Sequence, residues 1–111
     1  SSDVCSSDLN SEQRKNLHLA AVIANNFVNF MAIQSYEYLE KNNIDGTLIQ
    51  PLLKETVLRL SGFHPRNMQT GPAKRNDEKV IEKHLKMLDS NPKLQSLYRQ
   101  ISQLINEYYG R

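Results

Sequence analysis

Residues 17–31 read LHLAAVIANNFVNFM, and this stretch decides the fold of the chain. From Ser11 to about Lys41 the sequence contains neither proline nor glycine. Apolar residues recur there at steps of three and four, the spacing of one helix face. They are Leu17, Ala20, Ala21, Ala24, Phe27, Val28 and Met31. The pattern predicts one long helix that is capped by Ser11 and ends before Asn42-Asn43. Such a helix is roughly 45 Å long, so we expect it to pack against a further surface.

Three shorter helices are predicted downstream of this one. They are expected from Asp45 or Thr47 to about Leu60, from a capping Asp77 to Leu88, and from Asn91-Pro92 onward. The expected buried positions of the first of them are Leu48, Leu52, Leu53, Thr56, Val57 and Leu60. Residues 63–76, with Pro65, Gly71 and Pro72, are expected to form an ordered loop. No segment alternates with period two. The predicted class is all-α, a helical bundle of about four helices with one long first helix.

Composition restricts the class of protein further. The chain has 111 residues, 39% of them hydrophobic and 23% charged, which suits one globular domain. No apolar run reaches the roughly 18 to 20 residues of a membrane span, so we expect no membrane partner. A net charge of +2 is too small to imply a nucleic-acid partner. A single cysteine excludes a disulfide framework and a cysteine metal cage. We expect a cytoplasmic protein without a metal site.

The first nine residues, SSDVCSSDL, need a separate explanation. They show no helical or strand periodicity and resemble the translation of a sequencing-library adapter. A polar, serine-rich tail is the alternative. Under the adapter interpretation residues 1–9 are not native, Cys5 included, and residues 10–111 are a fragment whose upstream part is missing.

A line of polar residues interrupts the apolar first helix. At 100° per residue His18, Asn25, Asn29 and Tyr36 lie within about 40° of one another. Asparagine is a poor residue for a helix interior, because its amide competes with the backbone. Asparagines among alanine, valine and phenylalanine therefore indicate that something polar meets them. The alternative is a hydrogen-bonded seam between helices, with His18 a satisfied histidine at its edge.

A second candidate is the loop QTGPAKRND at residues 69–77. Gly71 allows a close backbone approach, and Gln69, Thr70 and Arg75 can donate hydrogen bonds to a carboxylate, carbonyl or phosphate. The loop could equally be a connection that ends in a helix cap. Basic residues nearby are interspersed with acids and resemble a solvated helix face rather than a nucleic-acid groove. They are Arg66, Lys74, Arg75, Lys79, Lys83 and Lys86.

The pairing of LHLAAVIANNFVN at residues 17–29 with QTGPAKRND at residues 69–77 resembles a known family. It is similar to the C-terminal domain of bacterial Rossmann-like proteins labelled domain of unknown function 2520. LLKET at residues 52–56 and IEKHL at residues 81–85 follow the same order. The resemblance covers nearly all of residues 10–109. Proteins of this family are described as NADP oxidoreductases.

The resemblance implies a fold similar to the C-terminal dimerisation domain of 6-phosphogluconate dehydrogenase-like reductases. It implies an N-terminal Rossmann domain, missing here, that binds NADP in the parent protein, so that this fragment alone binds no cofactor. The chain would close the cleft for a small-molecule substrate and form a homodimer. Residues at the cleft would be His18, Asn25 and Asn29 for catalysis, and Gln69, Thr70, Gly71 and Arg75 for substrate binding. Some related reductases carry a helix lysine where this chain has Ala21. The competing hypothesis is a non-catalytic helical protein-interaction module.

Overall fold

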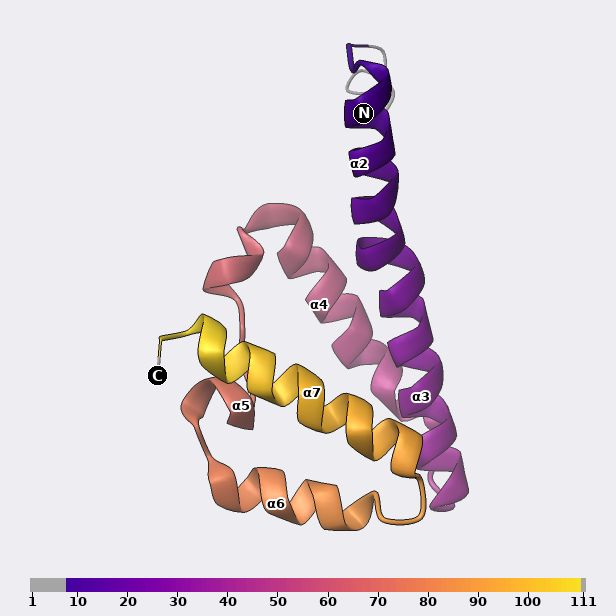
Figure 1. Cartoon of the computed structure of the whole chain (residues 1–111). Coiled ribbons are helices and arrows are strands. Elements are labelled where there is room, and N and C mark those ends of the chain that lie inside the picture. The colour runs from indigo at the N-terminus through magenta and orange to yellow at the C-terminus, as the bar shows by residue number, and fades with distance from the viewer. Residues whose placement is uncertain (1–7, 111) are drawn as a thin grey trace. The chain divides into compact units, whose positions relative to one another are not determined.

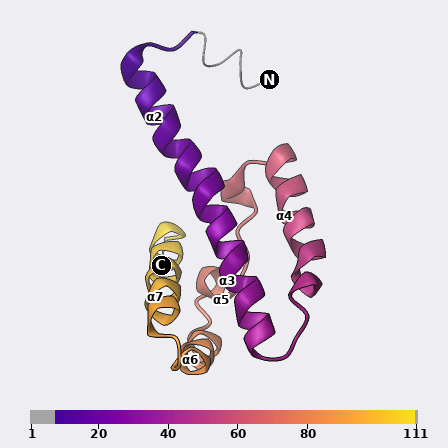
Figure 2. The same cartoon turned by 90° about the vertical axis from the view of Figure 1, so that its right-hand side faces the viewer.

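The long first helix is confirmed by a computed structural model of the chain, which describes residues 8–110. It consists of α2 (Ser11–Ala21), a π-helical segment η1 (Val22–Phe27) and α3 (Val28–Lys41). These three segments follow one another as one continuous helix (Figures 1 and 2). It ends at Asn42, after which Asn43 adopts a left-handed backbone conformation with φ of 63°. The asparagine pair therefore ends the helix as predicted.

The start of this helix differs by one residue from the prediction. Asn10, not Ser11, is the N-cap, and its side chain accepts a hydrogen bond of 2.8 Å from the backbone N–H of Gln13. The Gln13 side chain accepts one of 3.0 Å from the backbone N–H of Asn10. This reciprocal pair is a capping box, which needs an amide or carboxylate side chain three residues after the cap. Asn10 has Gln13 at that position, whereas Ser11 has Arg14.

The three helices predicted downstream begin where the sequence predicts, and two further short helical turns lie in the predicted loop. Their bounds are η2 (Gly46–Ile49), α4 (Gln50–Gly62), η3 (Pro65–Asn67), α5 (Pro72–Arg75), α6 (Glu78–Met87) and α7 (Pro92–Tyr108). The side chains of Asp45, Asp77 and Asn91 accept hydrogen bonds from backbone N–H groups of the helices that follow them. The predicted loop at residues 63–76 is ordered and contains two short helical turns, η3 and α5. Residues 8–110 contain no strand, so the all-α class is confirmed.

The chain divides within α4 into two compact units, Ser1–Leu53 and Lys54–Arg111. In the first unit η2 packs against the end of α3. Gly46 is buried there, and a Cβ atom added to it would lie 2.7 Å from Cδ2 of Tyr36. In the second unit α6 and α7 form an antiparallel hairpin with α5 packed against both (Figure 1). Ala73 and Leu88, 5% and 7% exposed, are the buried apolar residues of the described part of the chain.

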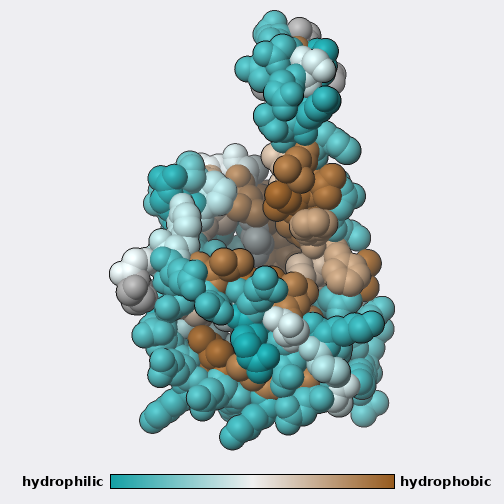
Figure 3. Space-filling model, in the orientation of Figure 1, coloured by the Kyte–Doolittle hydropathy of each residue, from teal (hydrophilic) through white to brown (hydrophobic). Residues whose placement is uncertain are grey.

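Much of the apolar surface is exposed. Figure 3 shows apolar side chains gathered along the long helix beyond its hydrophilic first turns. Exposed fractions are 45% for Leu17, 57% for Phe27 and 51% for Val28. The prediction that the apolar face of residues 48–60 is buried is wrong for this chain. Exposed members are Leu48, Leu52, Val57 and Leu60, whereas Leu53 is half-buried.

The length and composition of the continuous helix Ser11–Lys41 would also allow it to cross a membrane. The sequence analysis, which looked for an uninterrupted apolar run, did not predict a helix of this length and composition. The same two criteria are met by core helices of globular proteins, so they do not by themselves identify a membrane protein.

The adapter interpretation concerns residues 1–9. Residues 1–7, Cys5 among them, lie outside the described residues. Of the other two, Leu9 accepts a hydrogen bond of 2.6 Å at its carbonyl oxygen from Nη1 of Arg14.

Candidate functional site

The first set of predicted site residues lies on the long helix, in the unit that ends at Leu53. His18 is in α2, Asn25 in the π-helical segment and Asn29 in α3, and all three are exposed. The predicted polar line assumed a regular α-helix throughout. Because a π-helical turn holds more residues than an α-helical turn, positions after Phe27 are rotated relative to the predicted line. Short π-helical segments inside α-helices occur frequently at functional sites.

The side chains of this set have no hydrogen-bond partner among residues 8–110. This holds for His18, Asn25 and Asn29, and also for Asn26. The described residues therefore form no hydrogen-bonded seam through these amides. Since the amides are exposed, water can satisfy them, and they cost the chain little free energy as they stand. They are available to an external polar group.

The second set lies in the unit that begins at Lys54. Gly71 has φ of 102°, a conformation that favours glycine, and it is the residue before the first turn of α5. Gln69 is half-buried, and its Nε2 donates a 3.1 Å hydrogen bond to the carbonyl oxygen of Thr70. Arg75 is exposed, and one terminal nitrogen lies 3.8 Å from a carboxylate oxygen of Asp77. Part of its charge is therefore already balanced within the loop.

The loop is held in place by a residue that the sequence analysis missed. The amide nitrogen of Asn106, on α7, donates hydrogen bonds of 3.2 Å to the carbonyl of Ala73 and 3.0 Å to Oδ1 of Asn76. Asn76 follows the last residue of α5 and is in the left-handed conformation with φ of 57°, which ends the helix. An asparagine inside a helix was the signal used for Asn25 and Asn29. Applied to α7, it would have identified Asn106 as well.

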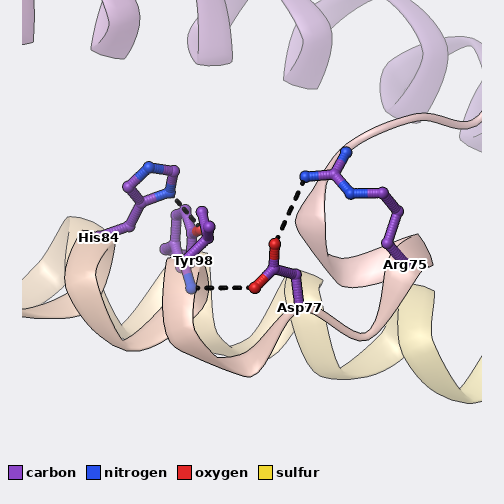
Figure 4. A network of polar contacts seen from close by, with 5 residues as sticks. Arg75, Asp77, His84 and Tyr98 are labelled. Carbon is purple, nitrogen blue, oxygen red and sulfur yellow. Dashed lines mark hydrogen bonds and ion pairs between the residues drawn. The ribbon is translucent and has the colours of Figure 1, made fainter.

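Polar contacts also link α5, α6 and α7 (Figure 4). Asp77 pairs with Arg75 and caps α6 by accepting a 3.3 Å hydrogen bond from the backbone N–H of Val80. Farther along α6, Nδ1 of His84 lies 2.7 Å from the hydroxyl of Tyr98 on α7, and the two rings meet edge to face. Burial raises the pKa of the Tyr98 hydroxyl, against a smaller lowering by the hydrogen bond with Ser102. His84 is half-buried.

The two predicted sets thus belong to two different units, the catalytic set to the first and the substrate-binding set to the second. Within residues 8–110 no group of three or more histidine, cysteine, aspartate or glutamate side chains is placed to hold a metal ion. The two sets offer amide and guanidinium groups as hydrogen-bond donors. Such donors suit a carbonyl or an oxyanion.

None of the curated proteins matches the chain. Among solved structures, the chain is similar to "putative NADP oxidoreductase BF3122" from Bacteroides fragilis, with a TM-score of 0.86 and 45% sequence identity. The match covers 89% of this chain and 38% of that chain, so the present chain spans well under half of its relative. The model of the family described as "Domain of unknown function (DUF2520)" matches residues 5–105. The chain belongs to this family, as its two sequence motifs predicted.

Proposed function

We propose that this chain is the substrate-cleft and dimerisation domain of an NADP-dependent oxidoreductase. Its parent would act in the bacterial cytoplasm on a small molecule, with the nucleotide held by a Rossmann domain. The observation that carries this proposal is the likeness to the Bacteroides fragilis protein, at 45% identity over 89% of the chain. At that identity, side chains as well as the backbone can be compared.

The exposed amides of the long helix support the cleft role. An amide that is exposed and unpaired in the chain can donate a hydrogen bond to a substrate carbonyl and polarise it. Asn25 and Asn29 would have this role, and His18 would supply a proton. The second set would hold an anionic part of the substrate, with Thr70, Gly71 and Arg75 as donors. Neither step requires a metal.

The exposed apolar residues of the same helix support the dimerisation role. Contiguous apolar patches larger than a few hundred Å² are rare on monomeric proteins and mark interaction sites. Phe27, Val28 and Phe30, exposed by 57%, 51% and 52%, lie within four consecutive residues and flank Asn29. A second copy of the helix would cover such residues while the amides remain at a cleft. This reasoning favours a protein partner over a membrane, since a bilayer would leave the amides without hydrogen bonds.

The test is amide removal in the parent protein. Asn25→Ala and Asn29→Ala should each lower kcat/KM with NADPH by about 10- to 100-fold, because a lost donor to a developing charge costs about 1.5 to 3 kcal/mol. The melting temperature should change by less than about 2 °C, since the amides make no bond within the chain. Asn16→Ala, on the exposed first turns of the helix, is the matched control.

The competing hypothesis of a non-catalytic interaction module predicts the opposite ranking. In that case the amide variants would weaken helix pairing and lower the melting temperature, with no oxidoreductase turnover to lose. A parent that neither binds NADP(H) nor oxidises it with any carbonyl substrate would also contradict the proposal.

A further inference from the structure

A depression in the second unit lies outside both predicted sets, apart from Gln69. It has a volume of about 330 Å³ and is lined by His64, Pro65, Arg66, Gln69, Leu104, Ile105, Tyr108 and Tyr109. Among these residues His64, Arg66 and Gln69 carry hydrogen-bond donors. The others present aliphatic side chains and tyrosine rings. Leu104 is 58% exposed, so its apolar surface is available to a ligand.

Arg66 is fixed in this depression by three hydrogen bonds. Its Nε donates to the Tyr108 hydroxyl at 3.0 Å, and its carbonyl accepts from the Tyr109 hydroxyl at 2.8 Å. Its backbone N–H donates to Nδ1 of His64 at 3.1 Å. These contacts use the backbone and the inner nitrogen of the guanidinium. The two terminal nitrogens keep their donor capacity.

Arg66 differs in this respect from Arg75, the arginine selected from the sequence. Arg75 pairs with Asp77, whereas no carboxylate among residues 8–110 pairs with Arg66. A second cationic side chain lies near the depression, because Nζ of Lys74 is 5.1 Å from the centre of the Tyr109 ring. Two outward nitrogens of one guanidinium match the spacing of two oxygens in a phosphate or carboxylate.

We infer that this depression binds an oxyanion carried on an apolar body, with Arg66 as the group that holds the anion. The phosphate or carboxylate would bond to the terminal nitrogens of Arg66. The apolar body would lie against Pro65, Leu104 and Ile105. The inference is independent of the proposed function, because it uses neither the long helix nor any redox step.

The test is isothermal titration calorimetry on the 111-residue chain with four probes. Phenyl phosphate and benzoate carry both parts of the ligand, inorganic phosphate only the anion, and benzyl alcohol only the apolar body. Phenyl phosphate or benzoate should bind at least about tenfold more tightly than either single part, because both kinds of contact are then made. The ratio between phenyl phosphate and benzoate identifies which oxyanion the depression prefers.

Variants then locate the binding. Arg66→Gln should weaken phenyl phosphate binding about tenfold, and Arg99→Gln, at an exposed position of α7 outside the depression, by less than twofold. Tyr108→Phe keeps the ring but releases Nε of Arg66, so it should weaken phenyl phosphate binding about threefold and leave benzyl alcohol binding unchanged. Circular dichroism verifies that each variant is folded. Equal losses in Arg66→Gln and Arg99→Gln, or inorganic phosphate binding as tightly as phenyl phosphate, would overturn the inference.

Discussion

The long helix and the helices around α7 carry the same kind of pattern in the sequence but differ in what holds them. Residues 11–41 make capping bonds and backbone bonds within the helix, and most of their large apolar side chains stay exposed. In α5, α6 and α7, by contrast, polar groups far apart in sequence meet, as in the bonds of Asn106 to Ala73 and Asn76. The first region leaves most of its apolar face exposed, and the second is linked by its own contacts.

The largest expected effect tests whether a second copy of the chain covers that exposed face. Phe27→Glu places a charge at an apolar position of the long helix that is 57% exposed. If the helix pairs with itself, burying this carboxylate should weaken self-association at least about 100-fold. Sedimentation velocity at micromolar concentration measures this. Met87→Glu, on α6 and 51% exposed, is the control and should leave the sedimentation unchanged. A wild-type chain that is monomeric throughout would contradict the pairing.

The second expected effect concerns the small core beside α7. Leu88 is 7% exposed, so Leu88→Ala should lower the free energy of unfolding by about 2 to 3 kcal/mol. Leu104→Ala, at a residue that is 58% exposed, should cost less than about 1 kcal/mol. Urea unfolding followed by circular dichroism compares the two. Equal losses would mean that the second region is not held by its core.

The same contrast explains what the sequence could predict. Helix positions depend on local signals, so the periodicity and the predicted caps Asp77 and Asn91 placed the downstream helices correctly. The capping box of Asn10 is equally local, but Asn10 and Ser11 are both favoured cap residues, so residue preference alone does not choose between them. The π-helical segment had no sequence signal that periodicity could detect, since the apolar residues on either side keep α-helical spacing.

Burial was less predictable than position, because it depends on which other elements are present. The apolar spacing of residues 48–60 shows that a face exists, but nothing in that segment specifies what covers it. For the candidate site, the sequence indicated which residue types could take part, but it did not indicate which hydrogen bonds and ion pairs they form. The pairing of Arg75 with Asp77, and of Arg66 with Tyr108, 42 residues away, required the three-dimensional structure.

A smaller effect is expected at the turn that follows the long helix. In Gly46→Ala the new Cβ would lie 2.7 Å from Cδ2 of Tyr36 and 3.2 Å from Oε2 of Glu40. One of these must move, so we expect a loss of about 1 to 2 kcal/mol in the free energy of unfolding. A Cβ at Gly62, the last residue of α4, meets nothing within 4 Å, so Gly62→Ala should be neutral or slightly stabilising. A thermal melt of both variants is sufficient. If Gly46→Ala is as stable as Gly62→Ala, the close approach of η2 to α3 is wrong.

The smallest effect sharpens the comparison at the His84–Tyr98 pair. Because burial raises the pKa of Tyr98 above its ordinary value of 10.0, the folded chain keeps this proton at a pH where the unfolded chain has lost it. The folded state then binds more protons, so the free energy of unfolding falls as the pH rises through this range.

In Tyr98→Phe that proton is absent. The variant should be less stable than the wild type by about 1 kcal/mol at pH 8, where the hydroxyl bond to His84 is lost. The difference should shrink as the pH rises above about 10. Urea unfolding at a series of pH values measures it, with Tyr38→Phe in the first unit as the control for removing a tyrosine elsewhere. A nonzero difference that stays constant with pH would contradict the raised pKa of Tyr98. A difference near zero at every pH would show that Tyr98 contributes packing alone, and that the second region is less dependent on its polar links than the structure indicates.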